Sequence, residues 1–303
     1  MSSIFEQAIT YLDIDYRERF HYLVGLEDYK QRLSKILSLL INPSGLEAWK
    51  NKFHPDATTV INSILKRPPL IVLEGDVGSG KSELATTIGD YVAREEKIDI
   101  TLLPLSLSSR GEGRVGQMTQ LISSAFEETY NRANRMKSDS RSRGAVILLV
   151  DEADALAQSR ENSQMHHEDK AGVNAFIRGV DRLGNGKVPA AVIMCTNRLN
   201  SLDPAITRRA AEILKFRRPN AGQIRMVLEN PLKELGFTSE QIDQIVKLTG
   251  VKEDREYAFT YSDLLQRLLP SIVLQAFPTS KVNPELAIKL TETVKPTKPF
   301  IEM

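Results

Sequence analysis

A glycine-rich stretch around residue 80 limits the folds open to this chain more than any other feature. It reads Gly75-Asp76-Val77-Gly78-Ser79-Gly80-Lys81-Ser82, between an apolar run and a helical pattern from Glu83 to Arg94. In such a strand–loop–helix context, glycines let backbone N–H groups turn inward around phosphate groups at a helix amino terminus. We therefore predict a nucleotide-binding loop, in which Lys81 reaches the β and γ phosphates and Ser82 offers its hydroxyl to Mg²⁺. The predicted nucleotide-binding residues here are Gly75, Asp76, Val77, Gly78, Ser79, Gly80, Lys81, Ser82 and Glu83.

Short apolar runs alternate with longer helical patterns between Leu70 and Phe216. The runs show no apolar–polar alternation, which is typical of parallel strands buried on both faces. They cover residues 70–73, 98–103, 145–150, 190–195 and 213–216. The predicted fold class is α/β, with a central parallel five-stranded sheet. Before it, helices are expected over 26–40 and 51–67.

The pattern becomes purely helical after Pro219. Helices are expected over 222–235, from a capping box at Thr238 and Gln241 to Gly250, and over 262–277, with one short helix after Pro278. A chain of 303 residues is long enough for two cores. We predict an N-terminal extension (1–22), a large α/β domain (23–218) and a small all-helical domain with a C-terminal tail (219–303).

A carboxylate pair, Asp151-Glu152, follows the third predicted strand. The carboxyl edge of a parallel sheet is where ligands bind, so the pair faces the same edge as the glycine-rich loop. Asp151 is predicted to bind Mg²⁺ and Glu152 to activate water against the γ phosphate. The alternative is a pair of exposed acids that closes a strand. Asp154 is interpreted only as a helix-start acid.

Two further features follow along the chain. Asn197 comes after the fourth strand, where its amide could orient the attacking water or could serve as a plain turn residue. Asp203-Pro204 predicts the start of a helix that carries Arg208 and Arg209. Arginines at this point can assist hydrolysis only from a neighbouring subunit, as a trans-acting finger. Surface salt bridges are the alternative.

Charge and composition exclude several classes of protein. The 40 basic and 39 acidic residues give a net charge of +1, so no general field attracts nucleic acid or an anionic membrane. The single cysteine, Cys195, leaves no internal disulfide. Apolar runs fall far short of the roughly 20 residues of a membrane helix. We expect a cytoplasmic protein that uses ATP and Mg²⁺, with neither a membrane nor a nucleic acid as partner.

Taken in order, these features resemble the AAA+ ATPases from about residue 23 to 271. Val24-Gly25 resembles that family's adenine-side segment. The small helical domain resembles that family's lid domain, and we call it the lid. Residues 173–181, with Arg209-Ala210-Ala211-Glu212, resemble most the pachytene-checkpoint family. The resemblance implies a homohexameric ring that remodels a HORMA-domain protein by pulling a terminal segment of it through a pore. It also implies that Arg209 is the finger.

The chain departs from that family at three places. Fewer than 25 residues precede Val24, where eukaryotic members carry a client-adaptor domain. The expected pore loop, 105–118, has no aromatic residue, which leaves Leu107, Arg110 or Val115 to grip a client. The start of the third lid helix lacks the family's sensor arginine, and Arg267 is the candidate replacement. The size resembles the compact bacterial forms that accompany HORMA proteins and cyclic-nucleotide synthases in anti-phage defence.

Two other functions stay open. One is a DNA-associated loader or initiator, although the sequence shows no helix-turn-helix, zinc module or basic domain after the lid. The other is a nucleotide-gated scaffold without turnover, against which Lys81, Asp151 and Glu152 weigh.

Overall fold

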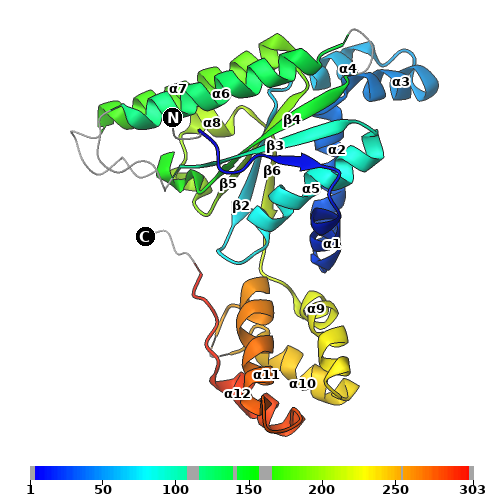
Figure 1. Cartoon of the computed structure of the whole chain (residues 1–303), viewed down its shortest axis with the longest axis vertical. Coiled ribbons are helices and arrows are strands. Elements are labelled where there is room, and N and C mark those ends of the chain that lie inside the picture. The colour runs from blue at the N-terminus through cyan, green and yellow to red at the C-terminus, as the bar shows by residue number, and fades with distance from the viewer. Residues whose placement is uncertain (1–3, 108–115, 139–141, 157–165, 254, 300–303) are drawn as a thin grey trace. The chain divides into compact units, whose positions relative to one another are not determined.

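A six-stranded sheet forms the centre of the α/β part of the chain (Figure 1). The computed structural model describes residues 4–107, 116–138, 142–156, 166–253 and 255–299. The strands are β1 (Ile9–Tyr11), β2 (Leu70–Gly75), β3 (Asp99–Ser106), β4 (Gly144–Asp151), β5 (Ala190–Thr196) and β6 (Ala210–Phe216). Their order across the sheet is β1-β3-β4-β5-β2-β6.

The parallel core of the sheet is as the sequence predicts. β3 pairs with β4, β4 with β5, and β5 with β2, all in parallel. Seven of the eight residues of β4 are buried, as expected for a strand covered on both faces. The α/β fold class is thereby confirmed.

The prediction of five strands missed β1, which pairs antiparallel with β3 at the edge. A strand of three residues is too short to show any period. Side-chain packing holds β1 in place instead: the Tyr11 ring lies directly against Gly89, and its hydroxyl donates to the backbone carbonyl of Thr86.

Helices cover both faces of the sheet. α6 (Gln117–Met136) and α7 (His166–Gly186) pack on one face, where Phe126 and Phe176 meet edge to face with ring centroids 5.3 Å apart. α2 (Glu27–Ile41) and α5 (Lys81–Glu96) lie on the opposite face (Figure 1). This layering directs the carboxyl ends of the strands to one common edge.

The predicted helix over 51–67 is wrong in its bounds. The structure has α1 (Ile14–Tyr22), α3 (Pro43–Phe53) and α4 (Thr58–Leu65) before the sheet. Pro55 lies between α3 and α4. Its ring disfavours the helical conformation of the preceding residue and it has no N–H to donate, so one helix cannot run through it.

The C-terminal helices are α9 (Ala221–Glu234), α10 (Ser239–Thr249), α11 (Leu269–Ala276) and α12 (Pro284–Thr293), coloured yellow to red in Figure 1. The capping box predicted at Thr238 and Gln241 is present. The expected helix over 262–277 instead begins as a π-helical turn, η3 (Asp263–Leu268). Pro270, in the first turn of α11, cannot donate a backbone hydrogen bond and so interrupts the α-helical ladder.

Contacts divide the chain into two compact units. The first comprises residues 1–21, 28–74 and 82–215, and the second 22–27, 75–81 and 216–303. The glycine-rich loop thus groups with the C-terminal helices, although they are far apart in sequence. The domain boundaries given above stay predictions.

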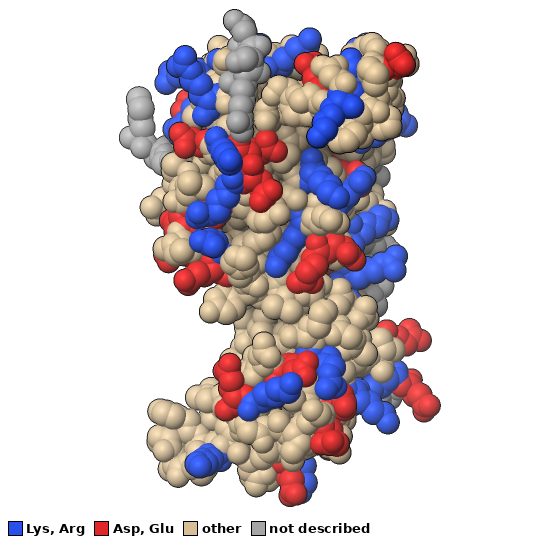
Figure 2. Space-filling view, turned by 90° about the vertical axis from the view of Figure 1, so that its right-hand side faces the viewer, with Lys and Arg blue, Asp and Glu red and all other residues tan. Residues whose placement is uncertain are grey.

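The surface carries charges of both signs. On the face shown in Figure 2, Lys and Arg side chains lie among Asp and Glu side chains, without an extended field of one sign. Within the described ranges, no helix has the length and apolar character needed to span a membrane.

Candidate active site

The glycine-rich loop has the backbone of a phosphate cradle. Gly78 and Gly80 have φ angles of 77° and 92°, a region that side chains disfavour. The loop leads into the amino terminus of α5, where N–H groups have no helical acceptor. Lys81 is 6% exposed, and its Nζ donates to the carbonyl oxygens of Gly75 at 2.6 Å and Asp76 at 2.8 Å. A positive group held beside the amino terminus of a helix fits a nucleotide's phosphates.

The predicted adenine-side segment lies against this loop within the second unit. The Gly25 carbonyl accepts from Gln223 Nε2 at 2.8 Å and from the Tyr261 hydroxyl at 3.0 Å. A Cβ on Gly80 would lie 2.8 Å from Leu26 Cδ1. Gln223 of α9 and Tyr261, just before η3, therefore hold Gly25 beside the loop, as a nucleotide contacting both would require.

The predicted metal ligands meet in the first unit. Ser82 Oγ donates to Asp151 Oδ1 at 3.2 Å, which joins the start of α5 to the end of β4. Across the residues that the structure covers, no group of three or more His, Cys, Asp and Glu side chains could hold a metal ion. One hydroxyl and one carboxylate suit Mg²⁺, which keeps several waters and binds through few protein ligands plus phosphates.

Glu152 has a backbone φ of 53°, which is uncommon for a residue other than glycine. Such strain costs about 1–3 kcal/mol and persists where surrounding structure enforces it. Here the Glu152 N–H donates to Asp151 Oδ1 at 2.9 Å, and Ser106 Oγ donates to Glu152 Oε2 at 3.4 Å. Both carboxylates line a cavity of about 680 Å³, so water can reach Glu152.

Asp154 does more than start a helix, and that interpretation is corrected. Its carboxylate accepts from Thr196 Oγ1 at 2.5 Å, Asn197 Nδ2 at 3.0 Å and the backbone N–H of Asn197 and Arg198, each at 3.1 Å. β5 lies between β4 and β2 in the sheet. Asn197 is thus fixed at the carboxyl edge between the strand that carries Glu152 and the strand before the loop.

The predicted arginines lie beyond their helix. α8 (Pro204–Thr207) begins with Asp203 as its N-cap, as predicted, but ends before Arg208. Arg209 Nε and Nη2 donate to the two carboxylate oxygens of Asp181 in α7, at 2.8 and 3.1 Å. The hydrogen bond with Asp181 raises the pKa of Arg209 above its ordinary value, so the guanidinium stays charged.

Arg209 also lies far from the loop end of its own sheet. Arg67, before β2, donates to the Ala211 carbonyl at the start of β6, and Gly75, at the end of β2, lies against Phe216 at the end of β6. The two strands therefore run in the same direction. Arg209 precedes β6, so it stands at the amino edge, opposite the carboxyl edge that carries Asp151 and Glu152.

The gripping role predicted for Leu107 is wrong. Leu107 is 1% exposed and belongs to the core with Leu105, so it cannot contact a client. The other candidates, Arg110 and Val115, lie outside the described residues.

The two arginines of interest near the lid make different contacts. Arg267, the candidate sensor replacement, donates to Asp263 Oδ1 at 2.9 Å and to Thr297 Oγ1 at 3.4 Å. Arg218, which was not predicted from the sequence, contacts the glycine-rich loop: its Nε donates to Asp76 Oδ2 at 2.7 Å. The doublet Arg217-Arg218 directly after the last strand was the only signal for it.

Glu83, predicted to bind nucleotide, pairs with a residue of α1. Arg19 Nε and Nη2 donate to its carboxylate oxygens at 2.7 and 2.8 Å. The backbone N–H of Glu83 in the first turn of α5 is the part of the residue suited to phosphate.

The chain is similar to several known proteins. Residues 71–218 match the family model "ATPase family associated with various cellular activities (AAA)". CD-NTase-associated protein 6 of Escherichia coli (strain MS 115-1) is 56% identical over 303 residues, which are 100% of this chain and 97% of that protein. A chain in the solved E. coli MS115-1 HORMA:CdnC:Trip13 complex is 56% identical, with a TM-score of 0.92 and 99% of both chains covered.

A more distant relative supports the resemblance found in the sequence. Pachytene checkpoint protein 2 of Saccharomyces cerevisiae is 26% identical over 254 residues, 79% of this chain and 43% of its own length. The resemblance to the pachytene-checkpoint ATPases is thereby confirmed. The chain belongs to the AAA ATPase family, together with the CD-NTase-associated protein 6 proteins.

Proposed function

We propose that this ATPase forms a homohexameric ring in the bacterial cytoplasm and uses ATP and Mg²⁺ to remodel a HORMA-domain protein in anti-phage signalling. The observation that carries the proposal is the 56% identity, along the whole chain, to a component of a HORMA:CdnC:Trip13 complex. The hydrolytic part is supplied by Lys81, Ser82, Asp151 and Glu152 of the site described above.

Each residue of the site has a chemical task in this proposal. The loop N–H groups and Lys81 hold the phosphates, while Ser82 and Asp151 hold the hydrated Mg²⁺. The metal supplies electrostatic stabilisation of the charge that develops on the phosphoryl group. Glu152 accepts a proton from the attacking water, and Asn197, held by Asp154, orients that water.

Assembly would complete the site. Arg209 stands at the edge opposite the carboxylates of its own subunit, so it can assist hydrolysis only in a neighbour's site. The ring requires identical subunits in head-to-tail contact, which closed cyclic symmetry provides.

Client engagement would use the part of the predicted pore loop that is not in the core. With Leu107 buried, Arg110 and Val115 are the remaining candidates of the three. We propose that they contact a terminal segment of the HORMA protein during pulling.

The test uses the HORMA protein and CdnC of the E. coli complex as substrate. A preformed HORMA:CdnC complex is incubated with the wild-type chain or with Glu152→Gln, each in ATP, and separated by size-exclusion chromatography. The wild-type chain should release HORMA from CdnC, whereas the Glu152→Gln variant should bind the HORMA:CdnC complex and leave it intact. If wild type hydrolysed ATP and left the complex intact, the proposed client would be wrong. Turnover stimulated by DNA in that case would favour the loader function.

A further inference from the structure

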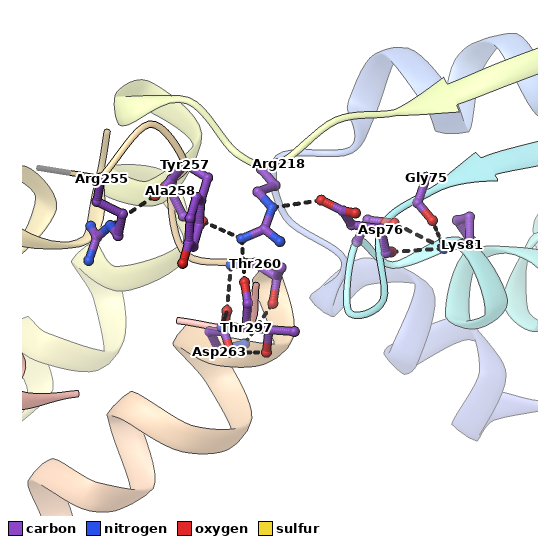
Figure 3. A network of polar contacts seen from close by, with 11 residues as sticks. Gly75, Asp76, Lys81, Arg218, Arg255, Tyr257, Ala258, Thr260, Asp263 and Thr297 are labelled. Atoms are coloured by element: carbon purple, nitrogen blue, oxygen red, sulfur yellow. Dashed lines mark hydrogen bonds and ion pairs between the residues drawn. The ribbon is translucent and has the colours of Figure 1, made fainter. Parts of the chain in front are cut away.

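Arg218 stands where the chain passes from β6 to α9, and its side chain is 10% exposed. Besides Asp76, its guanidinium reaches two backbone carbonyls: Nη1 donates to Ala258 O at 2.7 Å and to Thr297 O at 2.8 Å. It also lies over the Tyr257 ring, 5.0 Å from the centroid. Figure 3 shows these contacts converging on one guanidinium. All of these residues belong to the second unit.

A buried carboxylate holds the C-terminal segment after α12 close to this arginine. Asp263, 1% exposed, accepts from the Thr297 N–H at 3.0 Å and from Thr297 Oγ1 at 2.7 Å. Burial alone would raise the pKa of Asp263, but hydrogen bonds from Thr260 and Thr297 outweigh it and lower the pKa below its ordinary value. The carboxylate is therefore charged at neutral pH and holds Thr297 firmly.

On the loop side, Asp76 connects Arg218 to the lysine that holds the phosphates. The Asp76 side chain accepts from Arg218, and its backbone carbonyl accepts from Lys81 Nζ at 2.8 Å. A second link runs from the Ser262 N–H to the Gly78 carbonyl at 3.1 Å. Charge-assisted hydrogen bonds in a partly buried setting restrict the groups that they join more than neutral surface contacts do.

We propose that Arg218 is a positioning residue for the phosphate loop, through which the lid and the C-terminal segment 294–299 hold Asp76 and Lys81 in the nucleotide-binding conformation. The inference rests on ATP binding at this loop, as in the proposed function. The C-terminal segment thereby contributes to nucleotide affinity, although it is far in sequence from the glycine-rich loop.

The chain offers a matched control in Arg255. The guanidinium of this lid arginine also donates to backbone carbonyls, those of Leu248, Gly250 and Tyr257, and lies over the Phe259 ring. Its contacts are of the same kind as those of Arg218, but they do not include the phosphate loop. Arg255→Gln therefore removes comparable lid contacts without releasing Asp76.

The experiment measures ATP dissociation constants and amide hydrogen exchange of the nucleotide-free full chain. Arg218→Gln and Asp76→Asn should each weaken ATP binding about tenfold, the size expected for a charge-assisted hydrogen bond, and the double variant should lose no more than either alone. Arg218→Gln should also speed exchange in 75–81 and 294–299. Arg255→Gln should bind ATP within about twofold of wild type.

The possible outcomes separate the two proposals. Wild-type ATP affinity in Arg218→Gln, or additive losses in the double variant, would overturn the positioning role while leaving the ATPase assignment intact. Failure of the wild-type chain to bind ATP would overturn the proposed function instead. If Arg218→Gln does not fold, Asp76→Asn alone decides: unchanged affinity and unchanged exchange in 294–299 reject the inference.

Discussion

Asp154 accepts hydrogen bonds from both the side chain and the backbone of Asn197, and these bonds fix the orientation of the Asn197 amide. In the Asp154→Asn variant, the new side-chain NH2 group can face the NH2 group of Asn197, so two hydrogen-bond donors would oppose each other. Asn197 would then turn, and we predict that kcat falls about 10- to 100-fold while ATP affinity stays within about twofold. Single-turnover hydrolysis and equilibrium ATP binding measure the two effects.

The control for that prediction is Asp203→Asn. Asp203 accepts the Ala205 N–H as the N-cap of α8, and asparagine is an equally good cap. This variant should keep the wild-type kcat. Equal losses of kcat in both variants would show that the effect of Asp154→Asn is not specific to its contact with Asn197.

Leu107 provides a second prediction at the same scale. Because its side chain lies in the core, Leu107→Ala should lower the free energy of unfolding by about 2–5 kcal/mol. The exposed Leu12→Ala, at 59% exposure, should change it by about 0.5 kcal/mol or less. Denaturant titration checks both. A Leu107→Ala chain of wild-type stability that cannot remodel the client would restore the gripping role.

At the scale of elements, the contact between α7 and the residue before β6 bears on assembly. Mixing Arg209→Ala subunits with Lys81→Ala subunits should restore ATP turnover, because some interfaces then pair an intact arginine with an intact loop. Asp181→Asn breaks only the ion pair within one chain and should retain about half of the turnover or more, since such exposed pairs contribute little. Mixed rings as inactive as either parent would place Arg209 outside the neighbour's site.

The elements differ in how far the sequence predicts them. The strands β2 to β6 were predictable because continuous apolar runs need no knowledge of their neighbours. β1 was not, since its pairing depends on Tyr11 packing against α5. The loop residues form a local motif, whereas Asp154 meets Asn197 across 43 positions and Arg218 meets Asp76 across 142. Contacts of that separation leave no pattern in a single sequence.

At the scale of the whole molecule, one boundary between the two compact units falls in the sequence between Lys81 and Ser82. Lys81 belongs to the second unit with the lid, and Ser82 to the first with Asp151 and Glu152. Lys81, which we propose to hold the phosphates, and Glu152, which we propose to activate water, are thus supported by different cores. Binding and hydrolysis should therefore be separable by mutation.

The most direct test compares Lys81→Ala with Glu152→Gln in ATP binding and turnover. Lys81→Ala should abolish tight ATP binding. Glu152→Gln should bind ATP like wild type and lose turnover about a hundredfold or more, because the change is confined to water activation. Equal ATP affinity in the two variants, or turnover in Glu152→Gln near that of wild type, would contradict the account.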